Sequence, residues 1–125
     1  MKLVSKRISV ITTTAASTDT FYSTGPANGL VHAVVYTKST SATISSSALL
    51  SITGKDSGRD ILTSLTVGSA SYIKYIREST VVDTTNGTST GAMLVPIVDE
   101  RIKVTIGNSS VSNQLGTFDV ILEGA

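Results

Sequence analysis

The sequence contains few side chains that could carry out acid–base or nucleophilic chemistry. Its only histidine, His32, lies in the apolar run LVHAVVY at residues 30–36. It alternates in phase with Leu30, Val34 and Tyr36, on the strand face that we expect to be covered. A general base needs a nucleophile in reach and a group that orients it. The serine of the one G-x-S-x-G pattern, Ser89 in residues 87–91, lies in an expected polar connection and not in a strand-to-helix elbow. We therefore expect His32 to be a hydrogen-bonded residue of a sheet face, and the protein not to be an enzyme.

The acidic residues do not form an evident catalytic or metal-binding group. Asp99 and Glu100 are adjacent, so on a strand their side chains point to opposite faces. Asp56 lies in the turn sequence Gly54–Gly58 and Asp60 follows it, so the two could meet around a Ca²⁺ ion, but the EF-hand spacing is absent. The same turn also lacks the spacing of a phosphate loop. We predict a solvated, charged hairpin tip, with no metal and no cofactor.

Charge and cysteine content exclude further classes of site. Ten basic and nine acidic residues are scattered along 125 residues, for a net charge of +1. A nucleic-acid-binding protein needs a basic stripe that neutralises phosphates, so no nucleic-acid partner is expected. The absence of cysteine excludes disulfides and Cys-based metal sites. No run approaches the ~18 apolar residues of a membrane span, so no membrane partner is expected either.

The polar part of the composition indicates an all-β protein. Serine and threonine occur 19 times each, whereas charged residues make up only 15%, against about 25% in an average soluble domain. Threonine favours the half-buried surface of a strand, and serine favours turns. The length is close to the commonest domain size, so we expect a single domain.

Apolar alternation and turn residues divide the chain into strands and loops. Gly54–Gly58 is the predicted turn of a hairpin, and Pro96, which has no N–H, places its strand at an edge or a bulge. Residues 12–20 and 39–47 are expected loops, and residues 81–92 an expected long mobile connection. The expected strands cover residues 3–12, 30–38, 48–54, 59–67, 69–78, 93–98, 102–106 and 118–122.

One pairing is better supported by the pattern than the others. The alternating apolar residues of 102–106 answer those of 118–122 across a polar, glycine-containing segment, so we expect these two strands to form a hairpin. The residues concerned are Ile102, Val104 and Ile106 with Phe118, Val120 and Leu122.

Aromatic residues are few, with four Tyr, two Phe and no Trp. Tyr72 and Tyr75 fall on opposite faces of their expected strand, so at least one should be exposed. Interface anchoring and ordinary surface exposure remain open for that residue.

Seven or eight strands with turns between them and no helix predict a β-sandwich. We expect a jelly-roll-like arrangement, with an immunoglobulin-like one as the alternative. Residues 1–20 are expected to form an N-terminal strand or extended arm, and residues 21–125 the sandwich. A signal peptide is not expected, because Lys6 and Arg7 interrupt the start and Ile8–Ile11 is shorter than the required apolar region of about 7–15 residues.

Three segments together resemble a known group of proteins. FYSTGPANGLVHAVVYTK, AMLVPIVDERIKVTIGN and the closing GTFDVILEG resemble small virion-associated proteins of tailed bacteriophages. In that group a G-P-x-x-G turn leads into a long strand, and a P-I-x-x-E-R-I-K-V strand near the end precedes a glycine-bearing loop and G-T-F. The resemblance covers residues 21–38 and 92–124. It does not extend to residues 39–91 or to the N-terminal segment.

The resemblance implies a structural role, as a decoration (cement) protein that binds the outer surface of a capsid and stabilises it. The implied partners are the major capsid protein and further copies of the chain itself, as a homotrimer at local threefold sites. The protein would be made in the cytoplasm of the host bacterium and located on the capsid surface of the virion. A role in a fibre, baseplate or head–tail junction, or as a module that binds a glycan or another host-surface ligand, remains the alternative.

The N-terminal segment is the expected contact region. It could add a strand to the sheet edge of a neighbouring molecule, and its basic residues could meet an acidic capsid surface. We expect the contacts to capsid or subunits to involve Lys2, Lys6, Arg7, Ile8, Val10 and Tyr22.

Overall fold

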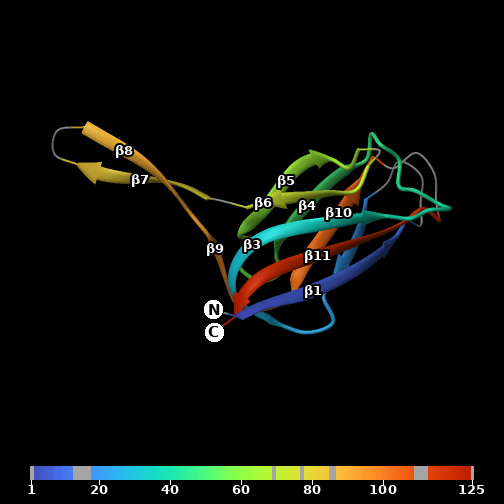
Figure 1. Cartoon of the computed structure of the whole chain (residues 1–125), viewed down its shortest axis with the longest axis horizontal. Helices are drawn as coiled ribbons and strands as arrows, with labels where there is room; N and C mark the ends of the chain where they lie inside the picture. Colours follow the sequence, from blue (N-terminus) through green and yellow to red (C-terminus); the bar gives the residue numbers. More distant parts are fainter. Residues whose placement is uncertain are drawn as a thin grey trace.

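Every regular element in the computed structural model is a β-strand (Figure 1). The structure describes residues 2–12, 18–68, 70–76, 78–84, 87–108 and 113–124, with the backbone alone over 63–64, 78–84 and 87–93. The strands are β1 (Lys2–Ile11), β2 (Asp19–Tyr22), β3 (Ala27–Lys38), β4 (Leu49–Gly54), β5 (Asp60–Thr66), β6 (Tyr72–Tyr75), β7 (Glu78–Thr84), β8 (Gly87–Met93), β9 (Val95–Glu100), β10 (Ile102–Gly107) and β11 (Leu115–Gly124).

Nine of these strands build two antiparallel sheets that pack face to face, and β7 and β8 form a separate two-stranded sheet. Sheet A has the order β1-β11-β3-β6, with β9 also paired to β3, and sheet B has the order β2-β10-β4-β5. The chain alternates between the sheets at β1, β2, β3 and β4, and again at β10 and β11. This crossing pattern is that of a jelly roll. The prediction of a jelly-roll-like β-sandwich is confirmed.

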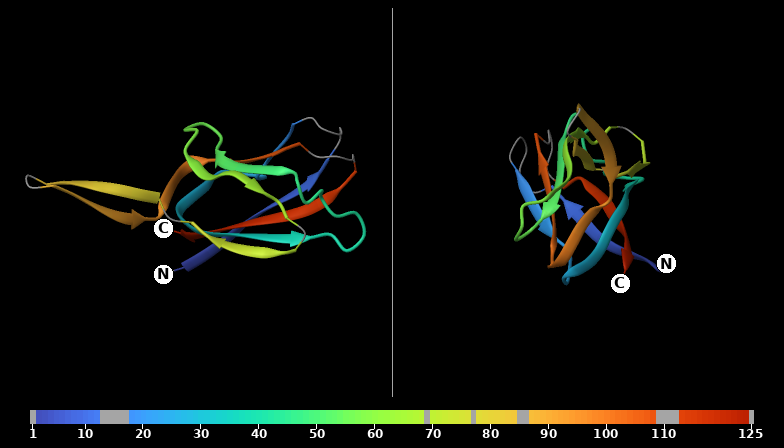
Figure 2. Two further views of the ribbon diagram at one scale, coloured as in Figure 1. Left: turned by 90° about the horizontal axis from the view of Figure 1, so that it is seen from above. Right: turned by 90° about the vertical axis from the view of Figure 1, so that its left-hand side faces the viewer.

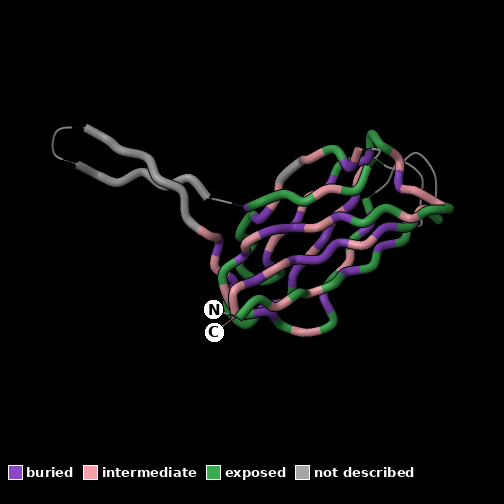
Figure 3. The backbone as a smooth tube through the Cα atoms, in the orientation of Figure 1, coloured by how far each residue is buried: buried purple, intermediate pink, exposed green. Residues whose placement is uncertain are grey.

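The core lies between the two sheets, as the buried positions in Figure 3 show. Because strand side chains alternate between faces, each strand contributes every second residue, and β10 contributes Ile102, Val104 and Ile106, all fully buried. On sheet A the ring of Tyr36 stacks on Phe118 with centroids 4.9 Å apart, and lies 5.2 Å from that of Tyr72. Burial of these apolar side chains is the main force that holds the sheets together.

The predicted hairpin of 102–106 with 118–122 is wrong. β10 pairs with β2 and β4 in sheet B, whereas β11 pairs with β1 and β3 in sheet A. The two apolar sets face each other across the core and not along one sheet. Alternation shows that a strand has one buried face. Two strands with matching alternation can be neighbours in one sheet or can face each other from opposite sheets, and the pattern does not distinguish these cases.

The hairpin predicted around Gly54–Gly58 is confirmed, since β4 and β5 pair on either side of it. The strand expected at 69–78 is present as the shorter β6, and Pro96 lies on β9 at the edge of sheet A, as expected. The loop expected at 12–20 is shorter than predicted, because Asp19 and Thr20 belong to β2; residues 13–17 lie outside the described residues.

One edge of sheet A is made of two short strands on the same neighbour. β9 pairs with the first part of β3, where Leu30 is opposite Pro96, and β6 pairs with its second part, where Ala33 is opposite Tyr75. Between them the chain forms the β7–β8 hairpin, which extends away from the sandwich (Figures 1 and 2). The expectation of a long connection without strands at 81–92 is therefore wrong, because its described residues belong to two paired strands. The mobility of this segment stays a prediction.

A β-bulge in β3 lies at the point where the hairpin leaves the sheet. Leu122 is opposite Val31 and Ile121 is opposite Ala33, so β3 has one extra residue, His32. The bulge reverses the alternation, and Val31 and Val34 are both fully buried. The prediction that His32 is in phase with Val34 is wrong for this reason.

Candidate interaction surface

The outer face of sheet A carries a set of apolar side chains along the β6 and β9 edge. The register places Ile73 opposite Val35, Tyr75 opposite Ala33, and Pro96 opposite Leu30, so these side chains share the face that points away from the core. We call this set the apolar band. It consists of Leu30, Ala33, Val35, Ile73, Tyr75, Pro96, Val98 and Ile121.

Several residues of the apolar band are exposed to a degree unusual for their size. Tyr75 is 73% exposed, Val98 74% and Ile73 53%. Single exposed apolar residues are ordinary, but a contiguous set indicates a site of interaction with another macromolecule. The band spans β6, β3, β9 and β11, on both sides of the point where the β7–β8 hairpin leaves the sandwich (Figure 1).

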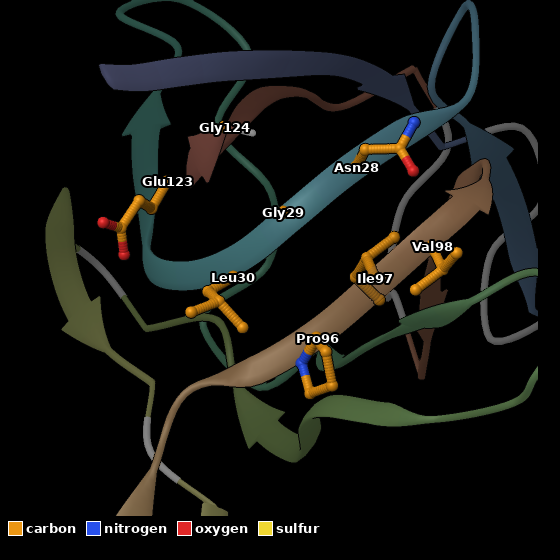
Figure 4. A pocket seen from close by; sticks show the side chains of 8 residues that line it. All are labelled: Asn28, Gly29, Leu30, Pro96, Ile97, Val98, Glu123 and Gly124. Carbon is orange, nitrogen blue, oxygen red and sulfur yellow. The ribbon is translucent and has the colours of Figure 1, made fainter. Parts of the chain in front are cut away.

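A shallow pocket of about 450 Å³ lies at the β9 end of the band (Figure 4). Leu30, Pro96 and Val98 contribute its apolar surface, and Asn28 and Glu123 are among its polar residues. Its other lining residues are Gly29, Ile97 and Gly124.

Gly29 determines how closely β3 approaches β11 at this pocket. Its φ is +133°, and a Cβ atom there would lie 3.0 Å from the carbonyl carbon of Glu123, which leaves no space for a side chain. Glycine is required at Gly29 both for the positive φ and for the close approach of the two backbones.

Two polar pairs lie on the same outer face, next to the band. The Nε and Nη2 atoms of Arg7 donate to the two carboxylate oxygens of Asp119 at 2.9 and 3.2 Å. The hydrogen bond to Asp119 and the charge of this carboxylate raise the pKa of Arg7. At the bulge, Nε2 of His32 lies 3.3 Å from Oε2 of Glu123, so the expectation of a hydrogen-bonded histidine is confirmed.

The expected contact residues of the N-terminal segment belong to β1, which pairs with β11 along its whole length. Lys2 and Arg7 are exposed and Lys6 is half-buried. Ile8 and Val10 are each only 2% exposed and belong to the core of this molecule. Their side chains fill the sandwich and do not face a partner.

Tyr22 lies apart from these residues, on β2 at the edge of sheet B. The residue is 42% exposed, and Nζ of Lys55 is 5.9 Å from the centroid of its ring. The structure therefore brings together the three basic residues of β1, on one edge of sheet A, but not Tyr22 with them.

Sequence reasoning did not single out the apolar band. One signal was available, because the alternation of Tyr72 and Tyr75 required one of them to be exposed; Tyr72 packs against the core and Tyr75 does not. The exposure of Val98 and the half-open pocket depend on β9 being an edge strand, which only the pairing of the sheets determines.

The acidic residues of the 54–60 turn and of the end of β9 hydrogen-bond to the turn or lie beside a basic residue. Oε1 of Glu100 accepts hydrogen bonds from the backbone N–H groups of Asp56 and Ser57 at 2.9 and 3.0 Å. Asp56 is exposed beside Lys55, with 3.7 Å between Oδ1 and Nζ. Within the part of the chain that the structure describes, no three His, Cys, Asp or Glu residues form a group that could hold a metal ion.

The backbone N–H of Ser57 has the largest effect on the pKa of Glu100, which lies below its ordinary value. Burial acts in the opposite direction, and the Ser57 hydroxyl, the N–H of Asp56 and the charge of Arg59 add to the lowering. Glu100 is therefore a carboxylate that holds the turn in place.

No helix among the described residues is long and apolar enough to cross a membrane.

Comparison with known proteins gives a relationship of fold. No protein-family model matches the sequence, and no curated protein matches it. Among solved structures the chain is similar to the crystal structure of FLHE, with a TM-score of 0.50 and 10% sequence identity over 98% of this chain and 99% of that chain. At this identity the similarity concerns the fold alone, so the apolar band is the feature on which a functional assignment can be built.

Proposed function

We propose that the protein is a structural component of a bacteriophage particle that binds the outer surface of the capsid and stabilises it. Two kinds of observation support this. The resemblance of residues 21–38 and 92–124 to phage virion proteins indicates the type of particle. The apolar band indicates binding to another protein. The partners in this proposal are the major capsid protein and further copies of the chain, and the protein is located on the capsid surface.

The observation that carries the binding role is the exposure of Tyr75 and Ile73 at 73% and 53% on one sheet face. Protein interfaces are enriched in aromatic residues at their centre, and a few such anchors supply most of the binding free energy. Tyr75 is flanked by Ala33, the residue opposite it in β3, so a partner that covers the ring would also cover the surrounding apolar surface. A rigid β-sandwich keeps this surface in one shape before binding, which reduces the entropy lost on association.

The test is co-sedimentation of the purified protein with capsids of the phage that encodes it, with Tyr75→Ser as the variant and Tyr22→Ser as the matched control. Both tyrosines are exposed. The sequence predicted Tyr22 as a contact residue, but it lies on sheet B, away from the apolar band on which this proposal is based. We expect Tyr75→Ser to weaken capsid binding about thirtyfold, as for a hot-spot residue, and Tyr22→Ser to leave it unchanged. Equal binding by all three proteins would exclude the apolar band, and no sedimentation of the wild type would exclude the capsid as partner.

A module that binds a glycan or another host-surface ligand is the second candidate, and the exposed ring of Tyr75 is the observation that favours it. Sugar rings stack on exposed aromatic faces, and the pocket with Asn28 and Glu123 is also lined by Leu30. Specific binding on a glycan array, lost in Tyr75→Ser, together with no capsid binding, would support this candidate over the first. Identification of the protein in fibres, baseplates or head–tail junctions would support another structural role.

A further inference from the structure

The outer edge of sheet A at β1 is an open site for pairing with another strand. β1 runs for ten residues and pairs with β11 without a register shift, and the strand order places it at the end of the sheet. It contains no proline and no bulge. Its basic residues Lys2, Lys6 and Arg7 oppose pairing with a like-charged edge, but not with a strand that carries acidic residues. The other described edges are shorter or irregular: β2 has four residues, β5 pairs with register shifts, and β9 contains Pro96.

The β7–β8 hairpin contains a strand that could pair with this edge. Its two strands pair over seven residues, from Glu78 opposite Met93 to Thr84 opposite Gly87, and neither pairs with another described strand. A two-stranded ribbon is marginally stable in water by itself. β7 has the sequence ESTVVDT, rich in β-branched residues, whereas β8 contains two glycines. β7 is therefore the better strand to extend a sheet.

The charges of the two strands match in position. Lys2 and Arg7 are five residues apart on β1, and Glu78 and Asp83 are five residues apart on β7. An antiparallel register that sets Glu78 opposite Arg7 also sets Asp83 opposite Lys2. Opposite charges directly across two strands are stabilising, and antiparallel pairs are the commoner kind.

The residues between these charges also distinguish the two possible orientations. In the antiparallel register Val81 stands opposite Val4 and Val82 opposite Leu3. A parallel register would match the charges as well, but it would set Val81 opposite Ser5 and Val82 opposite Lys6. Only the antiparallel register matches both the charged and the apolar positions.

We propose that β7 of one molecule adds antiparallel to the free edge of β1 of a second copy of this chain, with residue 80 opposite residue 5. The hairpin leaves sheet A at the edge opposite β1, so the pairing joins two molecules and extends sheet A of one with the hairpin of the other. The contact uses two different surfaces, and repeated contacts of this type form a closed ring or an open chain. The assembly does not depend on capsid binding and can be tested on the purified protein alone.

Disulfide trapping tests the register directly, because the chain contains no cysteine. The variant Ser5→Cys/Thr80→Cys places one thiol on each strand at opposed positions, and Ser9→Cys/Thr80→Cys is the matched control with the first thiol four residues further along the same exposed face. Under mild oxidation we expect covalent multimers in the first variant and monomers in the control and in both single variants. Only monomers, or equal cross-linking in the two double variants, would overturn the proposal.

A charge exchange tests the same contact without cysteines. Lys2→Asp and Asp83→Lys are each expected to weaken self-association about fivefold, the size of a cross-strand charge effect, as measured by light scattering over a concentration series. The double variant Lys2→Asp/Asp83→Lys should restore it, because the pair is then reversed. Failure of the double variant to recover, with both single variants folded, would contradict the antiparallel register. Both experiments use the purified protein alone, so their results do not depend on whether the protein binds capsids.

Discussion

The two hairpins of this protein differ in how their ends are held. The turn between β4 and β5 is fixed from outside the hairpin, because Oε1 of Glu100, at the end of β9, accepts the N–H groups of Asp56 and Ser57. The β7–β8 hairpin has pairing within itself and with no other described strand. The first hairpin is thus part of the rigid sandwich, whereas the second extends from it (Figure 2).

The difference teaches which backbone groups are available to another molecule. A backbone N–H or C=O that is satisfied inside the fold contributes to stability, and one on a free strand edge can bind a partner. Changes at the β4–β5 turn should therefore lower the free energy of unfolding. Changes in the β7–β8 hairpin should alter association and leave the unfolding of the sandwich nearly unchanged.

The largest effect is expected for Gly54→Ala. A Cβ atom at Gly54 would lie 2.7 Å from Cδ of Glu100 and 2.8 Å from Oγ of Ser57, so the carboxylate would have to move away from the turn. We expect the free energy of unfolding to fall by about 3 kcal/mol, from overpacking and lost hydrogen bonds, in denaturant titration. Gly25→Ala is the matched control, because nothing lies within 4 Å of its added Cβ. Equal stability of the two variants would show that the turn is not held by Glu100.

A smaller effect is expected for Glu100→Gln, which keeps the shape and removes the charge. Hydrogen bonds to a charged acceptor are the stronger kind, so we expect a loss of about 2 kcal/mol at pH 7. Since the pKa of Glu100 in the fold is below its ordinary value of 4.5, its contribution is complete above pH 4.5. It is lost as the pH falls through the lowered pKa, so wild type and variant should converge in acid. Asp99→Asn, at the exposed neighbour, is the control and should leave the free energy of unfolding at pH 7 nearly unchanged.

Ser57→Ala should have a weaker effect again. Oγ of Ser57 accepts the backbone N–H of Arg59 at 3.1 Å and lowers the pKa of Glu100 through a hydrogen bond. The backbone hydrogen bonds of Ser57 and Asp56 to Glu100 remain in the variant, and that of Ser57 has the largest effect on this pKa. We expect a loss of about 1 kcal/mol in thermal or denaturant unfolding. The pKa of Glu100, followed by NMR titration, should rise towards its ordinary value. A loss greater than that of Glu100→Gln would contradict the dominant role of the carboxylate.

The smallest effect on stability is expected when the β7–β8 hairpin is removed. β6 and β9 each pair with β3 independently of the hairpin, so replacement of residues 78–93 by two glycines should change the free energy of unfolding by less than about 0.5 kcal/mol. The measurement is made at a concentration at which the wild type is monomeric. A loss of 2 kcal/mol or more would show that the hairpin belongs to the cooperative fold of the sandwich.

Much of the fold could be predicted from local pattern, and the errors have a common cause. The alternation of Ile102, Val104 and Ile106 predicted a strand with one buried face, but not whether its partner lies in the same sheet or across the core. The hairpin at 81–92 carried its own signal, Asn86-Gly87, a dipeptide typical of hairpin turns; Asn86 itself lies outside the described residues. Its polar Ser/Thr composition concealed the strands, because polar residues give no alternation of apolar and polar positions.

The candidate surface was less predictable than the fold. Because Tyr72 and Tyr75 fall on opposite faces of their strand, local pattern predicts that one of the two is exposed. It does not predict that the exposed residue is Tyr75. Val98 and Ile121 join Tyr75 on one face only because β9, β3 and β11 are neighbours in sheet A. Ile8 and Val10 were expected contact residues, and the pairing of β1 with β11 buries both instead.

The sequence by itself determined the β class, the positions of most strands and turns, and the residues that must be buried, because these depend on side-chain period and on the backbone preferences of glycine and proline. The tertiary structure alone decided which strands are neighbours, which edges remain open and which exposed residues share a face. Those properties depend on contacts between segments far apart in the chain. The bulge at His32 illustrates this, since one extra residue in β3, visible only against β11, reverses which side chains of the strand face the core.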